Sequence, residues 1–174
     1  MKQKLLFTLA LLTLLGNTAL QANYVAYDAE DQKNYIKKYR KIAIEEMERT
    51  GVPASIKLAQ GLLESAAGTS HLATKGNNHF GIKCHNDWKG KSILHDDDVE
   101  NECFRSYKNP LRSYRDHSLF LVQRDRYSDL FKLKRKDYEG WARGLKDAGY
   151  ATDPKYAEKL ISLIERFDLQ RFDE

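Results

Sequence analysis

Helical spacing of apolar residues is lost between Gly68 and Pro110 of this 174-residue chain and is present on both sides of that interval. Within the interval Gly, Asn, His and Asp accumulate, and only residues 91–94 and 103–107 have the composition of short strands. A polar hairpin inserted between two groups of helices predicts an α+β domain. In such a domain a small β lobe faces a mostly helical body, and a cleft lies between them.

Helices are predicted on both sides of the hairpin from apolar residues that recur every three or four positions. The first helix ends at Gly51, and the second begins at Pro53, because proline is favoured in the first helical turn. Two more helices cover residues 111–121 and 138–145, and Asp153-Pro154 opens the last one. The residues expected on buried faces are Ile36, Tyr39, Ala43 and Met47 in the first helix, Val52, Ile56, Ala59, Leu63 and Ala66 in the second, and Ala157, Leu160, Ile161, Ile164 and Phe167 in the last.

The N-terminus has the pattern of a secretory signal peptide over residues 1–22. A short basic start precedes an apolar run over residues 5–15, and cleavage is expected after Ala22. The cleaved form would be exported, to a periplasm or out of the cell. An uncleaved N-terminal anchor is the alternative.

After cleavage, residues 23–33 are expected to form a flexible lead-in and residues 34–174 a single folded domain. No other stretch approaches about 18 consecutive apolar residues, so stable membrane insertion is not expected after cleavage. Loss of Lys2 and Lys4 leaves 27 basic against 25 acidic residues, a net charge of +2. This weak charge gives no support to nucleic-acid binding, so we expect no nucleic-acid partner. A monomer is expected as well.

Cys84 and Cys103, the two cysteines of the chain, are separated by most of the predicted hairpin. An exported protein meets an oxidising compartment, in which two thiols brought together by a hairpin form a disulfide. A zinc site of Cys84 with His79 and His85 is the weaker alternative, because it lacks a fourth ligand and matches no structural zinc spacing. We therefore expect a disulfide, no metal site and no cofactor.

The segment from Ala59 to Gly68 places an acidic side chain, Glu64, in the last turn of the second helix. Negative charge is unfavourable there by about 0.3–1 kcal/mol, because the helix dipole is negative at its C-terminus. Partial burial adds to this pressure towards protonation, and a carboxylic acid that stays protonated near neutral pH serves as a general acid. The small residues 65–68 that follow leave room for a ligand. A solvated glutamate at a helix end is the alternative.

Five carboxylates gather within seven residues at the hairpin, across the expected cleft from the helix. They are Asp96, Asp97, Asp98, Glu100 and Glu102. Glycoside hydrolysis requires two carboxyl groups, because one protonates the leaving oxygen while the other attacks, activates water or stabilises the positive sugar. A solvated acidic turn is one alternative. A calcium loop is another, but this segment lacks the Gly and the final Glu that such a loop requires.

Several aromatic residues can stack on a sugar face and line the cleft. Trp88 stands among charged residues without apolar neighbours, which favours a ligand role for this ring over a core role. Tyr114 and Trp141 are expected in the core instead. The aromatic residues expected at the cleft are Phe80, Trp88, Tyr107, Tyr127, Tyr150 and Tyr156.

Three blocks of sequence carry a resemblance to a known family. They are residues 59–68 with Glu64-Ser65, residues 77–83 (Asn-Asn-His-Phe-Gly-Ile-Lys) and residues 148–157 (Ala-Gly-Tyr-Ala-Thr-Asp-Pro-Lys-Tyr-Ala). Through their order and spacing, over about residues 34–172, the chain resembles the bacterial glucosaminidases of glycoside hydrolase family 73. The resemblance implies a lysozyme-like fold and an endo-acting enzyme that cleaves the β-1,4 bond after N-acetylglucosamine in peptidoglycan. Peptidoglycan glycan strands are then the expected partner.

The same resemblance implies roles for individual residues. It makes Glu64 the general acid and Tyr150 a cleft residue near the reaction centre. It places Asn78 and Phe80 in the block that shapes the substrate groove. Asp98 best matches the second acid of the family.

The second acid stays open between four carboxylates, because the alignment can shift by one or two positions. Asp97, Glu100 and Glu102 are the alternatives to Asp98, although strand alternation would put Asp98 and Glu100 on one face and turn Asp97 away. Many members of the family have Gly and Trp at the positions of Ala66 and Ala67. This departure puts the shape of one sugar subsite in doubt and leaves the acid in place.

Two other functions are compatible with these residues. A muramidase or lytic transglycosylase also uses a helix-borne Glu followed by Ser in a lysozyme-like fold, but the second and third blocks argue against it. A cell-wall binding or assembly module that lost turnover is the non-enzymatic alternative. The retained Glu64 and the acidic hairpin argue against that alternative.

Overall fold

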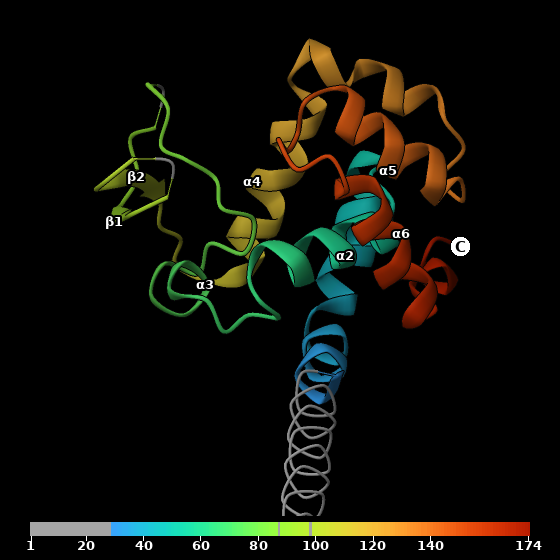
Figure 1. Ribbon diagram of the computed structural model, residues 1–174, viewed down its shortest axis with the longest axis horizontal. Helices are drawn as coiled ribbons and strands as arrows, with labels where there is room; N and C mark the ends of the chain where they lie inside the picture. Colours follow the sequence, from blue (N-terminus) through green and yellow to red (C-terminus); the bar gives the residue numbers. More distant parts are fainter. Residues whose placement is uncertain (1–28, 87, 98) are drawn as a thin grey trace, which may run out of the picture. The chain divides into compact units, whose positions relative to one another are not determined.

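The computed structural model describes residues 29–86, 88–97 and 99–174 (Figure 1). The chain divides into two units after Asn34, and the larger unit is Tyr35–Glu174. The predicted signal peptide and residues 23–28 lie outside the described residues, while residues 29–33, expected to be a flexible lead-in, are helical. None of the helices within the described ranges is long and apolar enough to span a bilayer.

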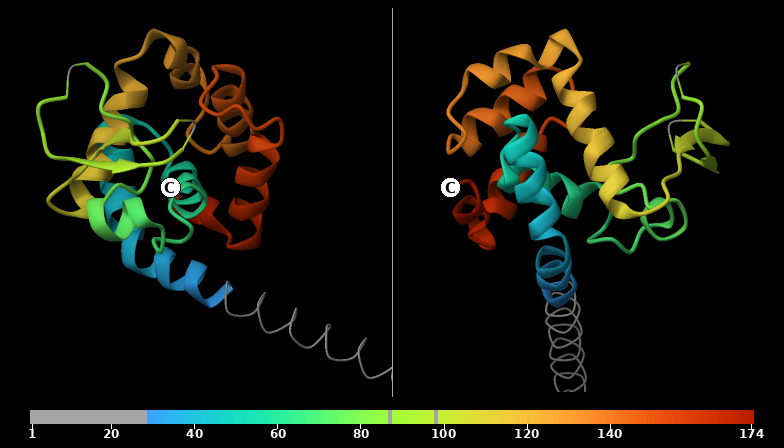
Figure 2. Two further views of the ribbon diagram at one scale, coloured as in Figure 1. Left: turned by 60° about the vertical axis from the view of Figure 1, so that its left-hand side comes forward. Right: turned by 180° about the vertical axis from the view of Figure 1, so that it is seen from behind.

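Helices make up most of the larger unit, as the two views of Figure 2 show. Residues 35–50 are helical, and Gly51 follows with a φ of +83°, which glycine adopts more readily than other residues. The structure has the helices predicted around the hairpin and adds α3 and two 3-10 helices. The elements after residue 51 are α2 (Ala54–Glu64), α3 (His71–Gly76), α4 (Pro110–Val122), η1 (Asp125–Lys132), α5 (Tyr138–Asp147), α6 (Tyr156–Arg166) and η2 (Leu169–Phe172).

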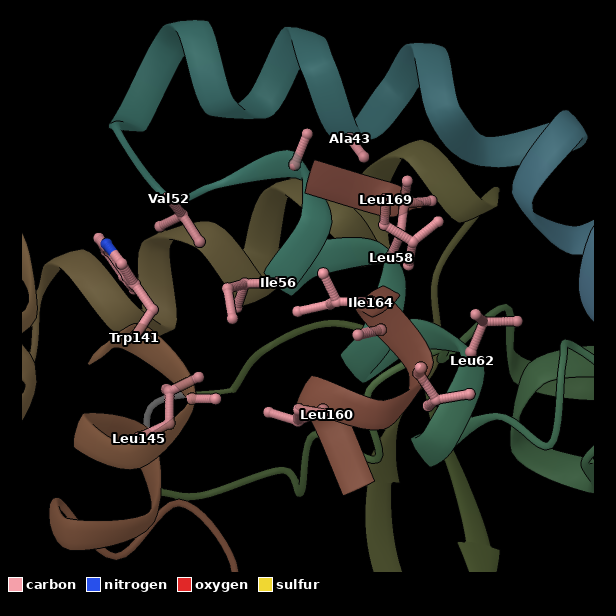
Figure 3. Packing of buried hydrophobic residues seen from close by; sticks show 14 of the residues in the cluster. Ala43, Val52, Ile56, Leu58, Leu62, Trp141, Leu145, Leu160, Ile164 and Leu169 are labelled. Carbon is pink, nitrogen blue, oxygen red and sulfur yellow. The ribbon is translucent and has the colours of Figure 1, made fainter. Parts of the chain in front are cut away.

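Helix α2 is the centre of the helical body and packs against α5, α6 and η2. Figure 3 shows its side chains Ile56 and Leu58 among apolar side chains that include Leu160 and Ile164 of α6. Every residue from Ala54 to Leu62 is buried, as expected of a helix with neighbours on all sides. The most buried helix of the fold is therefore the one that carries Glu64.

Most residues of the predicted buried faces are buried, while Leu63, Ile161 and Phe167 are partly buried and pack against the core, and one residue of the second helix is exposed. The core includes Tyr114 and Trp141, which are at most 1% exposed, as predicted. Ala66, expected on the buried stripe of the second helix, is exposed because α2 already ends at Glu64. The helix stops where the backbone enters a left-handed turn.

That turn follows Glu64 and contains three consecutive residues with positive φ, namely Ala66 (48°), Ala67 (53°) and Gly68 (83°). A non-glycine residue in this conformation costs about 1–2 kcal/mol. The Ser65 hydroxyl donates to the Gly61 carbonyl and accepts a hydrogen bond from the Gly68 amide at 2.7 Å. These contacts hold the turn in place, so the backbone leaves α2 abruptly beside the Glu64 carboxyl.

The start of α2 is held by a residue from the other end of the chain. Pro53 occupies the N-cap position, and its side chain makes no capping hydrogen bond. Asp173 supplies the missing cap, because its carboxylate accepts from the Ser55 amide at 2.8 Å and from the Ser55 hydroxyl at 2.6 Å. An acidic group at this end of a helix is also favoured by the helix dipole.

The predicted hairpin is present as two antiparallel strands, β1 (Ser92–His95) and β2 (Glu102–Arg105), as Figure 1 shows. The register pairs the first residue of β1 with the last residue of β2. Cys84 forms a disulfide with Cys103, as expected, and its amide donates to the Cys103 carbonyl at 2.9 Å. The α+β, lysozyme-like fold class predicted from the sequence is confirmed.

Candidate active site

Glu64, the last residue of α2, lines a cleft of about 420 Å³. One wall of the cleft comes from the hairpin lobe and the residues before it, and another comes from the segment after α5. The polar side chains on its walls include Glu64, Ser70, Lys83, His85, His95, Asp97 and Tyr150, and the apolar ones include Leu72, Phe80, Ile82, Phe104 and Phe120. The cleft predicted between the helical body and the β lobe is therefore present, with Glu64 in it.

The Glu64 carboxyl group is partly buried and has one hydrogen-bond donor among the described residues. The Tyr156 hydroxyl donates to Glu64 Oε1 at 2.9 Å and accepts from Gln60 Nε2 at 3.0 Å. Burial raises the pKa of Glu64, the hydrogen bond from Tyr156 partly offsets this, and the negative charge of Asp97 raises the pKa further. A raised pKa keeps more of this carboxyl protonated near neutral pH, which is the property that a general acid requires.

Replacing Tyr156 by Phe is expected to move the alkaline limb of activity to higher pH. The hydrogen bond from Tyr156 stabilises the charged form of Glu64, so its loss raises the pKa of Glu64 further, and a general acid then stays protonated to higher pH. The pH dependence of kcat/KM for the glycan substrate that the family resemblance implies measures the shift. Tyr138→Phe removes a hydroxyl outside the cleft and should leave the limb in place. A limb that moves to lower pH in Tyr156→Phe would contradict the conclusion that this hydrogen bond lowers the pKa of a general acid at Glu64.

Asp97 is the acidic side chain of the hairpin turn that the structure places in the cleft. Its carboxylate lies 3.3 Å from Lys83 Nζ, which also contacts Glu102 at 2.9 Å. The expectation that Asp97 faces away is wrong, because β1 ends at His95 and strand alternation does not continue into the turn. Asp98, the preferred match for the second acid, lies outside the described residues.

The other hairpin carboxylates have contacts of different kinds. Asp96 accepts a hydrogen bond from the Asn101 amide at 2.7 Å, across the turn. Glu100 is exposed in the same turn, and Glu102 begins β2. Neither Glu100 nor Glu102 is among the residues that line the cleft. No cluster of three or more His, Cys, Asp or Glu side chains suited to a metal ion occurs in the described part of the chain.

Tyr150 lies in the cleft wall, as the sequence predicted. Its ring stacks on the ring of Tyr156 with centroids 5.6 Å apart, and its hydroxyl lies 3.1 Å from His117 Nε2. Tyr156 was expected to contact substrate, but it is only 3% exposed and is hydrogen-bonded to Glu64. Its contacts are those of a residue that positions the acid from behind.

The block around Asn78 shapes the cleft from beneath. Asn78 is fully buried, and its amide donates to the carbonyls of Ile82 and Arg105 while its oxygen accepts from the Ile82 amide. Asn78 therefore supports the groove and does not line it. Phe80 is 4% exposed, borders the cleft, and packs face to face on His117 with centroids 4.0 Å apart.

Trp88 does not line the cleft that contains Glu64. It borders a second hollow of about 310 Å³, together with Tyr107 and Asp116. Its indole N–H donates to the Lys91 carbonyl at 2.9 Å, and the Arg105 guanidinium lies 4.7 Å above its ring. These contacts explain why an indole with no apolar neighbours in sequence is still half-buried.

Two residues beside the cleft, Lys57 and His117, were not predicted from the sequence. Both are fully buried, and Lys57 Nζ lies 3.0 Å from His117 Nδ1. The sequence held one signal for them. Lys57 is the one basic residue of α2, which is buried along almost its whole length. A buried lysine is rare unless it is paired, so its position points to a polar partner in the core.

Comparison with known proteins relates this chain to a family of glucosaminidases. Residues 40–169 match the family named Glucosaminidase, described as mannosyl-glycoprotein endo-beta-N-acetylglucosaminidase. The Exo-glucosaminidase LytG of Bacillus subtilis (strain 168) is 36% identical over 140 residues, which cover 73% of this chain and 48% of LytG. The chain thus spans about half the length of the curated relatives it matches.

Two solved structures share the fold over most of their length. A peptidoglycan hydrolase from Sphingomonas sp. A1 superposes with a TM-score of 0.70 at 30% identity, covering 80% of this chain and 91% of that chain. The glycoside hydrolase domain of FlgJ from Salmonella typhimurium gives a TM-score of 0.67 at 31% identity, with 80% and 90% covered.

Proposed function

The chain belongs to the glucosaminidase family, glycoside hydrolase family 73, and on this premise we propose that it hydrolyses peptidoglycan at the β-1,4 bond after N-acetylglucosamine. One observation carries the proposal. The partly buried carboxyl of Glu64 lies in a cleft, receives a hydrogen bond from Tyr156, and has a pKa raised by burial. This is the environment of a carboxylic acid that donates a proton near neutral pH.

In the proposed mechanism Glu64 protonates the glycosidic oxygen as the bond to the leaving sugar breaks. Positive charge then develops on the remaining sugar, and a carboxylate of the hairpin turn stabilises it or activates the attacking water. Asp97 lines the cleft and Asp98 matches the family's second acid, so these two are the candidates. Tyr150 lies beside Glu64 and bounds the site at which the sugar would bind.

Cleavage within the glycan strand is part of the proposal and follows from the sequence resemblance. The relative LytG is named an exo-glucosaminidase, so exo cleavage is the alternative to be tested. We also propose that the protein is exported, on the support of the signal-peptide pattern of residues 1–22.

Analysis of the fragments released from purified peptidoglycan tests the proposal. New reducing ends on N-acetylglucosamine are the expected product, and long fragments at early times are expected for internal cleavage. Reducing ends on muramic acid or anhydro-muramic ends would assign the protein to the muramidases or lytic transglycosylases. A protein that binds the glycan and releases no fragment would be a binding module.

Single replacements of the hairpin carboxylates should identify the second acid. We expect Asp97→Asn or Asp98→Asn to lower kcat roughly 10²-fold, the lower range of what a general acid or base contributes. Glu100→Gln and Glu102→Gln should lose less, because neither side chain lines the cleft. All four variants are assayed on one glycan. The largest loss at Glu100 or Glu102 would contradict the proposed site, and near-wild-type activity in all four would indicate one essential protein carboxylate.

A further inference from the structure

Lys57 is a fully buried lysine whose amino group has three neighbouring acceptors. Its Nζ lies 2.8 Å from the Tyr114 carbonyl, 2.7 Å from the Ser118 hydroxyl and 3.0 Å from His117 Nδ1. An ammonium group has three hydrogens to donate and no acceptor lone pair. The protonated form of Lys57 can donate to all three atoms, which requires that His117 Nδ1 carries no hydrogen.

Burial disfavours the protonated form of Lys57, and two nearby negative charges partly offset this effect. Burial lowers the pKa of Lys57 to about 7, while the negative charges of Glu46 and Asp116 raise it and the positive charge of Arg49 lowers it. Glu46 is itself 1% exposed and forms a salt bridge with Arg49. A buried carboxylate thus accompanies the buried ammonium, as the cost of burying an unpaired charge requires.

His117 is neutral, and its contacts decide which ring nitrogen carries the hydrogen. Burial, followed by the positive charge of Lys57, lowers the pKa of His117 well below its usual value. An ammonium group can only donate, so the protonated form of Lys57 requires that the hydrogen of the neutral ring is on Nε2. The ring of Phe80, parallel to the imidazole at 4.0 Å, holds it in this orientation.

The Nε2 atom of His117 lies 3.1 Å from the Tyr150 hydroxyl, and with the ring hydrogen on Nε2 the imidazole donates to the tyrosine oxygen. The hydrogen of Tyr150 must then be directed to a different acceptor. On the cleft side, the negative charge of Glu64 adds to the effect of burial in raising the pKa of Tyr150. The Tyr150 ring also stacks on Tyr156, which donates a hydrogen bond to Glu64. The Lys57 amino group is thus linked to the cleft through His117 and Tyr150.

We propose that Lys57 and His117 are positioning residues, which fix the Tyr150 hydroxyl as a hydrogen-bond donor towards the cleft, where an oxygen of the bound glycan can accept it. The catalytic part of this inference rests on the proposed function. Without the Lys57 hydrogen, the imidazole can carry its own hydrogen on Nδ1 instead. Its Nε2 atom would then accept from Tyr150 and turn the hydroxyl away from the cleft.

The tautomer of His117 can be measured directly by nitrogen NMR of the imidazole ring. We expect hydrogen on Nε2 in the wild-type protein, and hydrogen on Nδ1, in part or in full, in Lys57→Met. Wild-type protein with hydrogen on Nδ1, or an unchanged tautomer in Lys57→Met, would overturn the proposal. This readout requires no turnover, so it stands even if the wild-type protein releases no product and the proposed function fails.

A double-mutant cycle tests whether Lys57 acts on catalysis through Tyr150. Lys57→Met alone should lower kcat about tenfold, the scale of one lost hydrogen bond, with little change in KM. In a Tyr150→Phe background, which has no hydroxyl to direct, the same replacement should have no further effect on kcat. Losses that multiply in the double variant would mean that Lys57 only supports the fold, and the proposal would be rejected.

Asp173→Asn is the matched control, because it also weakens a buried polar contact of α2. Ser55, its partner, lies nine residues before Glu64, or about 13 Å along the helix. The effect of Asp173→Asn on kcat should be the same with and without the Tyr150 hydroxyl. If Lys57→Met does not fold, His117→Phe removes both ring nitrogens, retains an aromatic ring against Phe80, and is tested in the same cycle with the same two outcomes.

Discussion

Glu64→Gln is expected to lower the rate of peptidoglycan hydrolysis by at least about 10³-fold while the protein still folds and binds glycan. The amide has nearly the shape of the carboxyl group but cannot deliver a proton to the leaving oxygen. Its oxygen can still accept the hydrogen bond that Tyr156 donates to Glu64 in the structure, so the cleft wall keeps its contacts. Fragment release under substrate saturation measures the loss, and sedimentation with insoluble peptidoglycan measures binding.

Glu158→Gln is the matched control for this replacement. It makes the same chemical change at an exposed position of α6, two residues after Tyr156, and should leave the rate unchanged. Activity of Glu64→Gln within tenfold of wild type would remove Glu64 from the role of general acid. A loss of glycan binding as large as the loss of rate would instead assign Glu64 to substrate binding.

Removal of the Cys84–Cys103 disulfide is expected to lower the free energy of unfolding by about 3 kcal/mol, given the 18 residues between the two cysteines. For a domain of this size, the loss corresponds to a melting temperature roughly 6–12 °C lower. Activity should fall as well. A two-stranded hairpin has little stability of its own, and this one carries Asp97 into the cleft.

Thermal unfolding of wild type and of the Cys84→Ser, Cys103→Ser double variant, each with and without a thiol reductant, makes this test. Reductant should lower the melting temperature of the wild type to that of the variant and leave the variant unchanged. An oxidised wild type that melts at the same temperature as the variant would show that the bridge contributes nothing to stability. Equal activity in both would show that the lobe keeps its position without it.

The helical part of the fold could be predicted because its signals are local. Ile36 and Met47 repeat at helical spacing, and both are buried. The disulfide was predictable for a related reason, since export and a hairpin between two cysteines leave few other partners. Glu64 could be placed in the cleft because its position in the last turn of a helix can be read from the sequence.

The contacts that tune the site could not be predicted, because they join residues far apart in sequence. Tyr156 is 92 residues from Glu64, and a tyrosine that stacks on sugar has the same sequence pattern as one that holds a carboxyl group. Lys57 is 60 residues from His117, so its partner was equally hidden. Asp97 was misplaced for a different reason, because strand alternation was extended into a turn.

The hydrogen bonds between Ser55 and Asp173 join residues separated by 118 positions, and they cap the helix that ends at Glu64. Contacts of such long range form late, since a large loop must close first. We therefore expect a chain that lacks residue 173 to hold Glu64 loosely and to have little hydrolytic power. An exported chain would then gain that power only when this long-range contact has formed, after it has left the compartment in which it was made.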